Sequence, residues 1–330
     1  MGSGITFLTL FNNKGGVGKT TLVYHLAWMF SMQGYAVLAA DLDPQCNLTA
    51  SFLTEEQIEN APKKSNIYEA VYPIFAGTGD ITTPTPLKIQ TRLAILPGDL
   101  RLSLVEDELS LSWPRAGNGE ERSFRVLSAC YRALLSAAEN MGADLVLIDV
   151  GPNLGALNRT SIIASDYVIT PLAPDMYSLQ GLDNIGPTLR QWRTIWSRNK
   201  ENCPLKDLPL PQGKMEPLGY IVMQHSERTG RPTQSYHKWI DRIPAVFHEK
   251  ILEEQNCSLS VDADKFCLAR LKHYRSLMPM AMEVQKPIFN LTSADGAFGS
   301  HAQAVVNCRD DFTKLVQKLV MRIGLSLDNE

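Results

Sequence analysis

The sequence lacks the features that mark secreted and membrane-spanning proteins. Its six cysteines are scattered over 330 residues without a CxxC pair, so we expect reduced thiols rather than a disulfide framework. No apolar run reaches the roughly 18 residues that a transmembrane helix needs. The chain enters its first apolar run without a preceding charged segment or a cleavage site, so no signal peptide is expected.

A strong net charge is also missing. The 32 Lys and Arg residues nearly balance the 35 Asp and Glu residues, which gives a net charge of −3. This balance does not attract the whole protein to nucleic acid or to a membrane, so any such binding must come from a local patch. Hydrophobic residues make up 44% of the chain, which is ordinary for a globular protein with a large core.

The first 45 residues predict a strand, a glycine loop, a helix and a second strand. Residues 5–11 are apolar and rich in β-formers, as in a strand buried on both faces. Three glycines interrupt this pattern within residues 12–19, apolar residues then recur at helical spacing from Thr20, and Gly34 ends the helix. Residues 36–40 predict the next buried strand. Such a unit joins two parallel strands by a right-handed crossover.

The rest of the chain continues this alternation. We expect strands at residues 93–97, 144–149, 166–171 and 218–223, helices at residues 123–140, 178–198 and 305–323, and loops at residues 82–87 and 203–217. The pattern predicts an α/β fold with one doubly wound, mostly parallel sheet flanked by helices. No internal repeat or linker divides the chain, so we expect a single domain over residues 1–330.

A phosphate-binding loop is predicted between the first strand and the first helix. The residues expected to contact a nucleotide are Gly15, Gly16, Val17, Gly18, Lys19, Thr20 and Thr21. Glycines let backbone N–H groups turn toward phosphate oxygens, and the helix adds the positive end of its dipole. The Lys19 ammonium can reach the β- and γ-phosphates, and the Thr20 hydroxyl can ligate Mg²⁺. The spacing and the flanking elements together favour a P-loop over a turn without a ligand.

Two residues depart from the ordinary P-loop pattern. Position 13 is Asn rather than Gly, and Lys14 adds a second lysine to the loop. Because Lys19 already serves the phosphates of its own subunit, Lys14 could cross to a nucleotide in a facing subunit. The alternative is an ordinary solvated surface lysine.

The loop Lys14-Gly-Gly-Val-Gly-Lys-Thr-Thr21 resembles the deviant Walker A motif of the ParA/MinD family of P-loop ATPases, whose first lysine is the family signature. Residues 41–45 resemble the motif after the second strand in the ParA-type partition branch of this family. The resemblance to the family continues at residues 147–152, 279–287 and 299–302. The resemblance covers most of the chain and is weakest between residues 50 and 140.

The resemblance implies a slow ATPase that works as a switch. Such a protein binds ATP and Mg²⁺, forms a homodimer with ATP, binds nonspecific DNA, and positions or segregates a plasmid, a chromosome or a protein organelle such as a carboxysome. A small adaptor protein would stimulate its hydrolysis, and it would act in the cytoplasm on the nucleoid. Lys14 would then act across the dimer and, with Lys19, stabilise the transferring charge.

Carboxylates follow two of the predicted strands, where open α/β sheets bind their ligands. By the resemblance, Asp43 orients the attacking water and belongs to the metal site, whereas judged alone it would begin a turn before Pro44. Asp149 resembles a Walker B aspartate that holds Mg²⁺ together with Thr20. Asp41 is expected to support the site indirectly, through contacts with the residues that bind the ligand.

The adenine contacts are harder to predict. Met223 and Gln224 end a late strand and correspond to the base-contacting region of the family, although an unrelated loop position fits them about as well. The Gln224 amide has the donor and the acceptors needed to read the edge of adenine. The absence of an N-K-x-D run mildly favours ATP over GTP.

A local basic patch could bind DNA. Eleven basic and six acidic residues lie between Arg190 and Lys250, which is enough to bind a phosphate backbone without reading bases. The residues assigned to DNA are Arg190, Arg193, Arg198, Arg228 and Arg231. The alternative is a solvated helix face with ordinary charges.

Two other functions remain open from the sequence. A MinD-like ATPase on a membrane surface needs a basic amphipathic C-terminal helix, whereas residues 324–330 are short and acidic. A metabolic or assembly relative such as a reductase needs cysteines that bridge a cluster, and the cysteines here lie in the wrong context. Insertions around residues 50–140 and 225–275 are expected to form the partner surface.

Overall fold

The computed structural model describes residues 4–225, 238–272, 274 and 276–327, with the backbone alone at 224 and 225. Its sheet contains β1 (Thr6–Leu10), β2 (Val37–Asp41), β3 (Leu87–Gln90), β4 (Leu93–Leu96), β5 (Leu145–Asp149), β6 (Tyr167–Leu172), β7 (Glu216–His225) and β8 (Cys267–Lys272). The strand order is β3-β4-β2-β5-β1-β6-β7-β8, and only β3 runs antiparallel to its neighbour. The predicted mostly parallel sheet is confirmed.

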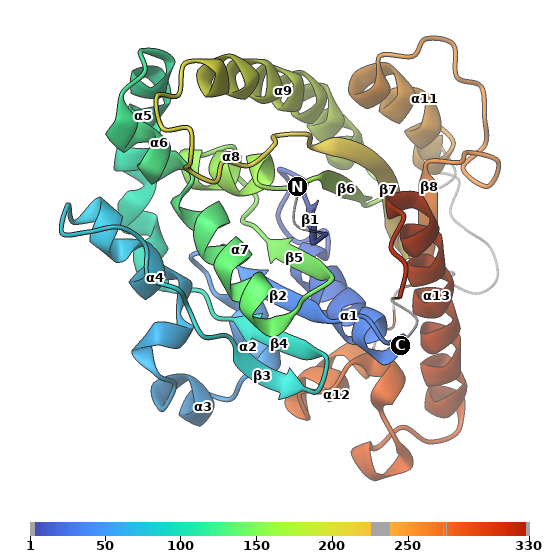
Figure 1. The fold of residues 1–330 in the computed structure, drawn as a ribbon. Coiled ribbons are helices and arrows are strands. Elements are labelled where there is room, and N and C mark those ends of the chain that lie inside the picture. Colours follow the sequence, from blue (N-terminus) through green and yellow to red (C-terminus); the bar gives the residue numbers. More distant parts are fainter. Residues whose placement is uncertain (1–3, 226–237, 273, 275, 328–330) are drawn as a thin grey trace.

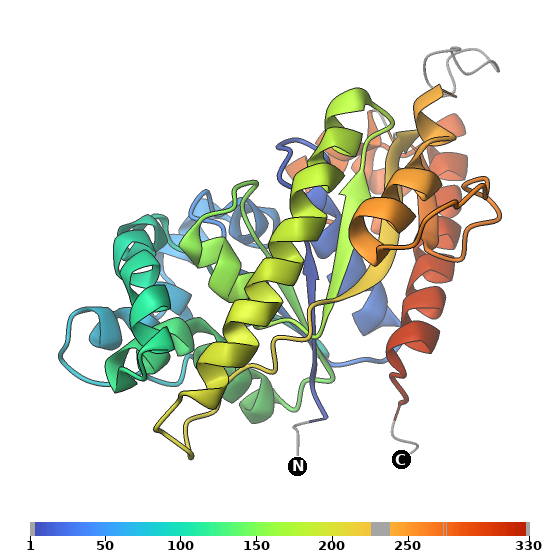
Figure 2. The same cartoon turned by 90° about the horizontal axis from the view of Figure 1, so that it is seen from above.

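Helices cover both faces of this sheet (Figure 1, Figure 2). The helices are α1 (Lys19–Met32), α2 (Asn47–Phe52), α3 (Glu55–Glu59), α4 (Ile67–Phe75), α5 (Glu106–Gly117), α6 (Glu121–Leu127), α7 (Ala129–Met141), α8 (Ala156–Ile163), α9 (Met176–Glu201), α11 (Ile243–Phe247), α12 (Leu277–Glu283) and α13 (Ser300–Ile323). Short 3₁₀ or π turns occur at η1 (Lys63–Ser65), η2 (Leu100–Val105), η3 (His248–Leu252), η4 (Ile288–Asn290) and η5 (Ser293–Asp295).

The core has two layers, one on each side of the sheet. One layer joins α1 and α13 to the sheet, and the other joins α4, α7, α8, α9 and α11 to the opposite face. Strands β1, β2 and β5 are almost entirely buried, which is why they read as continuous apolar runs in the sequence. No helix within the described residues is long and apolar enough to cross a bilayer.

The predicted helix over residues 123–140 is wrong in one respect, because the structure contains two helices there. The break falls at Ser128, between α6 and α7. The Ser128 hydroxyl donates to the Phe124 carbonyl at 2.7 Å and accepts a hydrogen bond from Arg132 Nε at 3.1 Å. A serine that bonds to its own helix in this way competes with the regular backbone pattern.

A buried histidine ties α1 to the C-terminal part of the chain. The His25 ring is 2% exposed and lies 5.1 Å from the Phe312 ring of α13, centroid to centroid. The backbone N–H of Ile288 donates to His25 Nε2 at 3.1 Å, so the ring proton lies on Nδ1, which donates to the Thr21 carbonyl at 2.8 Å. Burial lowers the pKa of His25 from 6.5 to about 4.

This burial predicts a pH dependence of stability. Below about pH 6.5 the unfolded chain binds a proton at His25, whereas the folded chain binds it only below about pH 4. The free energy of unfolding therefore decreases as the pH falls from about 6.5 to about 4. Between pH 7 and pH 5 we expect a loss of about 2 kcal/mol in the free energy of unfolding from this residue. Urea unfolding of the wild type and His25→Gln at both pH values checks it. Equal losses in the two proteins would contradict the assignment.

Candidate nucleotide-binding site

The glycine loop turns between the end of β1 and the start of α1. Gly18 is the N-cap of α1 and has a φ of 87°, in the left-handed region that favours glycine. A Cβ at this position would lie 2.9 Å from the mobile end of the Met223 side chain, Cε, so the backbone conformation is the main reason for glycine here. The N-terminus of the 14-residue helix α1 therefore opens directly onto the loop, as an anion site requires.

Asn12 fixes the start of the loop, a role that the sequence did not reveal. This buried side chain donates from Nδ2 to the Pro171 carbonyl of β6 at 2.7 Å. Its Oδ1 accepts the backbone N–H of Lys14 at 2.9 Å. The loop is thus anchored to the neighbouring strand, 159 residues away in the chain. A lone asparagine after a strand carries no signal of such a distant partner.

Lys19 lies inside the loop. The residue is 7% exposed, and its Nζ donates to the Asn12 carbonyl at 3.2 Å. Burial lowers its pKa, while the carboxylates of Asp149 and Asp43 raise it. The ammonium therefore has two acidic neighbours and weak carbonyl partners, an arrangement that suits a phosphate ligand.

Two aspartates meet at the carboxyl edge of the sheet. Asp41 and Asp149 are register partners on β2 and β5, and both are fully buried. Asp41 accepts from Thr49 N at 2.8 Å and from Thr49 Oγ1 at 2.7 Å, yet burial still raises its pKa to about 6. Of these two aspartates, Asp41 has hydrogen-bond partners within the described protein and Asp149 does not.

Neither carboxylate oxygen of Asp149 has a hydrogen-bond partner among the described residues. Burial, and then the charge of Asp41, raises the pKa of Asp149 to about 8. The nearby Thr20 hydroxyl lowers this pKa somewhat, although it does not reach hydrogen-bond geometry. A buried acid without partners needs an explanation. Oxygen donors from Asp149 and Thr20 fit Mg²⁺, which prefers carboxylates and hydroxyls.

Asp43 lies at the rim of the same site. It is 8% exposed, and its Oδ1 accepts from Gln45 N at 3.0 Å. A Cβ built at Gly151 would lie 3.3 Å from this Oδ1, so the loop after β5 passes directly beside it. Asn158 holds that loop, because its Nδ2 donates to the Gly151 carbonyl at 2.9 Å.

Lys14 forms an ion pair with Asp175, which the sequence analysis did not predict. Its Nζ lies 2.5 Å from Asp175 Oδ2, and the two side chains are 31% and 36% exposed. Asp175 also caps α9, since its Oδ1 accepts from Ser178 N at 2.9 Å. Burial alone would raise the pKa of Asp175, but the hydrogen bonds from Lys14 and Ser178 bring it below the usual value. One carboxylate therefore serves both the helix and the lysine.

A cavity of about 600 Å³ lies beside the loop, and neither Lys14 nor Asp149 is among the residues that line it. Its wall contains Gly15, Gly16, Gly18, Lys19, Thr20, Thr21 and Asp43 from the predicted set. The opposite wall contains Met278, Ala281 and Met282 of α12 and Lys286 beyond it, none of which the sequence analysis assigned. Val17 is buried beneath the loop, and Met223 lines a smaller pocket of about 100 Å³ that also touches Gly18 and Thr21. The side chain of Gln224 lies outside the described residues.

Three of the basic residues assigned to DNA are described, and all three lie on α9. Arg190 donates to the Lys250 carbonyl at 2.8 Å and pairs with Glu253 at 3.1 Å. Arg193 donates to the carbonyls of Lys214 and Met215, each at 2.7 Å. Arg198 is exposed on α9, while Arg228 and Arg231 lie outside the described residues.

Comparison with known proteins gives consistent matches. Residues 5–201 match a family described as AAA domain. Protein IncC of Escherichia coli is 31% identical over 209 residues, covering 63% of this chain and 50% of IncC. The chromosome partitioning protein ParA of Caulobacter vibrioides is 30% identical over 186 residues, covering 56% of this chain and 62% of ParA. The chain thus spans less than two thirds of the length of either protein.

A solved structure agrees with the sheet and helix arrangement. The ATP complex of a McdA variant from Cyanothece covers 100% of this chain and 100% of its own, with a TM-score of 0.63 and 16% identity. That likeness concerns the fold, whereas the family match extends over more than half of the chain. With its signature lysine, its glycine loop and these relatives, the chain belongs to the ParA/MinD family of P-loop ATPases.

Proposed function

We propose that the protein is a ParA-type ATPase that forms a homodimer on binding ATP and Mg²⁺, binds nonspecific DNA, and positions or segregates a cargo. The observation that carries this proposal is the pair of lysines in one loop, of which Lys19 is buried among acids and Lys14 is partly exposed, with 31% of its side chain accessible. A buried lysine suits the phosphates of its own subunit. A partly exposed one, held only by a surface ion pair, is available to a second subunit.

Gly15, Gly16, Val17, Gly18, Lys19, Thr20 and Thr21 would bind the phosphates. Thr20 and Asp149 would hold Mg²⁺, with Asp43 close by, and the ion would neutralise charge on the phosphate oxygens. Met223 and Gln224 remain the proposed adenine contacts.

Hydrolysis in this proposal is slow. Asp43 would orient the attacking water, since it lies at the rim of the cavity beside Gly151. Lys14 of the partner subunit would add charge stabilisation only in the dimer. A small adaptor protein would raise the rate further, and the segments 50–140 and 225–275 would provide its surface.

The DNA and cargo parts of the proposal rest on the family. IncC and the Caulobacter protein are relatives, and the second is named for chromosome partitioning. Among the described residues proposed for DNA, Arg198 is exposed on α9, whereas Arg190 and Arg193 contact main-chain carbonyls of the protein. The protein would accordingly act in the cytoplasm on the nucleoid. A MinD-like membrane role or a metabolic role would appear as ATP-dependent behaviour without DNA binding.

Replacing the partly exposed lysine tests the dimer. We expect Lys14→Gln to bind ATP within about threefold of the wild type but to lose ATP-dependent dimerisation and hydrolysis, because only the contact across the dimer is removed. Sedimentation with a nonhydrolysable ATP analogue and phosphate release measure the two losses. Lys64→Gln, the same change on an exposed turn, is the control. A Lys14→Gln protein that dimerises normally would refute the assignment.

Releasing the lysine tests the contact with Asp175. Asp175→Asn keeps a cap for α9 but removes the charge that holds Lys14. A partly exposed ion pair contributes at most about 1 kcal/mol. Because a dimer contains two such pairs, we expect ATP-dependent dimerisation to tighten by up to about 25-fold. Asp183→Asn on the same helix, which breaks a different surface pair, should leave it unchanged. Weaker dimerisation in Asp175→Asn would show that the carboxylate acts within the dimer instead.

Binding to nonspecific DNA over a salt series tests the cargo function. With ATP and Mg²⁺ we expect binding whose logarithm falls linearly with the logarithm of salt concentration. Arg198→Glu should weaken it and reduce the slope by about 2 per dimer. Lys88→Glu carries the same charge change on β3, at the far edge of the sheet from α9, and should have little effect. Binding that is absent, or unaffected by ATP, would favour the other functions.

A further inference from the structure

We propose that Glu106 is a positioning residue of this ATPase. Its carboxylate holds the loop between Asp149 and α8 in place, and thereby sets how strongly the site prefers ATP to ADP. The preference rests on the proposed function, whereas the contact that Glu106 makes does not. Glu106 is not among the residues that line the nucleotide cavity, and its place in the sequence did not mark it.

Glu106 caps a helix other than its own. It is the first residue of α5, yet its Oε1 accepts the backbone N–H of Ala156 at 2.5 Å and its Oε2 accepts that of Leu157 at 2.9 Å. The N-cap of α8 is Gly155, which has no side chain to make such bonds. A carboxylate at this place accepts N–H groups that the helix leaves unbonded and complements the positive end of its dipole. The cap of α8 therefore comes from a different helix.

Gly155 leaves room for this carboxylate. Its φ of −68° suits any residue, so the backbone conformation does not require glycine here. A Cβ at this position, however, would lie 2.5 Å from Glu106 Oε1 and 2.9 Å from Asn153 Oδ1. The close approach of side-chain oxygens to the start of α8 thus explains the glycine.

The loop before α8 is bonded to the same helix. Asn158 of α8 is buried, and its Nδ2 donates to the Gly151 carbonyl and to the Asn153 carbonyl, each at 2.9 Å. Asn153 Oδ1 in turn accepts from Gly155 N at 2.9 Å. A displacement of α8 is therefore carried to Gly151 by hydrogen bonds as well as by the chain.

This loop borders the proposed nucleotide site. It follows Asp149 of β5, and Pro152 lines the nucleotide cavity. Gly151 lies beside Asp43, whose Oδ1 a Cβ at Gly151 would approach to 3.3 Å. The proposed function assigns Mg²⁺ and the attacking water to these two aspartates, and both act on the terminal phosphate. A displaced loop should therefore weaken ATP more than ADP, which lacks that phosphate.

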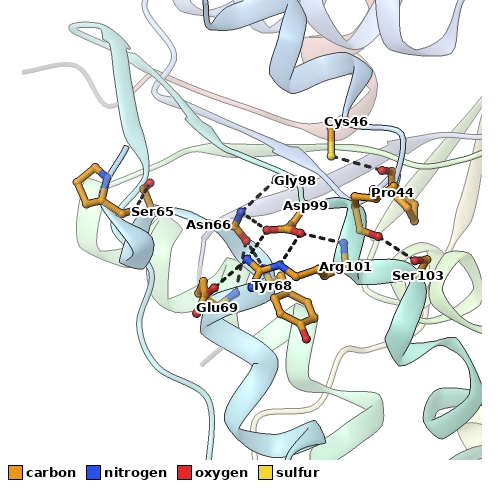
Figure 3. Close-up of polar contacts among 12 residues, drawn as sticks. Pro44, Cys46, Ser65, Asn66, Tyr68, Glu69, Gly98, Asp99, Arg101 and Ser103 are labelled. Carbon is orange, nitrogen blue, oxygen red and sulfur yellow. Dashed lines mark hydrogen bonds and ion pairs between the residues drawn. The ribbon is translucent and has the colours of Figure 1, made fainter. Parts of the chain in front are cut away.

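The segment that presents Glu106 is itself fixed (Figure 3). Glu106 directly follows η2, and Asp99 caps η2 by accepting from Arg101 N at 2.8 Å. Arg101 also donates from Nη2 to Asp99 at 2.6 Å and pairs with Glu69 of α4 at 2.8 Å. Asn66 donates to Asp99 at 2.9 Å. Because its base is anchored in this way, Glu106 restrains α8 rather than following it.

A stacked arginine joins the same two helices at a second point. Arg159 of α8 lies over the ring of Trp113 of α5, with Cζ 3.6 Å from the ring centroid. The Arg159 Nε and Nη2 atoms are buried and have no hydrogen-bond partner among the described residues, so stacking provides this contact. Glu106 and Trp113 lie about two turns apart on α5. The stack remains when Glu106 is replaced, so we expect such variants to fold.

Hydrogen exchange followed by NMR tests the contact without nucleotide. In Glu106→Gln a single amide oxygen replaces a carboxylate that accepts two N–H groups, so we expect the Ala156 and Leu157 amides to exchange about fivefold faster. Glu108→Gln removes the same charge from the same helix, where it pairs with Arg122, and should leave these amides unchanged. Wild-type exchange rates in Glu106→Gln would overturn the contact.

Nucleotide affinities test the preference. With Mg²⁺ we expect Glu106→Gln to lower the ratio of affinities for a nonhydrolysable ATP analogue and for ADP by about fivefold, with the ADP affinity within about twofold of the wild type. Gly155→Ala should act in the same direction, because its methyl group displaces the carboxylate without changing the charge. Glu108→Gln should keep the wild-type ratio. Competition against a fluorescent nucleotide, at a protein concentration below that of dimerisation, measures both affinities.

The outcomes separate this proposal from the proposed function. An equal loss for both nucleotides would show that Glu106 only supports the fold, and an unchanged or higher ratio would show that the loop does not depend on it; either result overturns the proposal. A wild-type chain that binds neither nucleotide would instead refute the ATPase function, while the exchange of the α8 amides would still report the contact of Glu106.

Discussion

The balance of charge at the carboxyl edge of the sheet is the constraint on which the site depends. Parallel pairing of β2 and β5 places Asp41 opposite Asp149, and both are removed from water. Two neighbouring buried carboxylates resist ionising together. Thr49 donates to Asp41, while within the described part of the chain neither carboxylate oxygen of Asp149 has a hydrogen-bond partner and Lys19 is the nearby cation. The position beside Asp149 therefore favours a cation, and the neighbouring loop of backbone N–H groups favours an anion.

The two lysines of the loop differ in environment more than in sequence position. Lys19 lies among main-chain carbonyls and acids, so its location hardly depends on anything outside the loop. Lys14 depends on Asp175, a residue 161 positions away that also begins α9. The same short loop thus combines a fixed cation with one whose partner can be exchanged. In the proposed function, Lys19 binds the phosphates of its own subunit and Lys14 binds a second molecule.

The sheet and the loop were predictable from sequence because buried parallel strands and glycine spacing are local signals. Strands β1, β2, β5 and β6 and the flanking helix α1 lie close to their expected positions. The contacts of Asn12 and Asp175 were not predictable, since their partners lie on strands and loops more than 150 residues away.

The basic residues illustrate the opposite difficulty. Counting charges in the segment suggested a DNA surface, but the count could not reveal that Arg193 already donates to two main-chain carbonyls. Similarly, the periodic pattern across residues 123–140 hid the break at Ser128, because a hydroxyl that bonds to its own helix leaves apolar spacing intact. For residues 123–140 the side-chain hydrogen bond of Ser128 decides where the helix breaks, whereas the DNA surface stays a prediction.

The length of α9 gives the Lys14–Asp175 contact a reach beyond the loop. This helix has 26 residues, so at the usual rise it extends about 39 Å. Leu182, Ile185 and Trp196 bury this helix in the core along its length. The ion pair of Lys14 is therefore attached to an element that the core holds in place as far as Arg198.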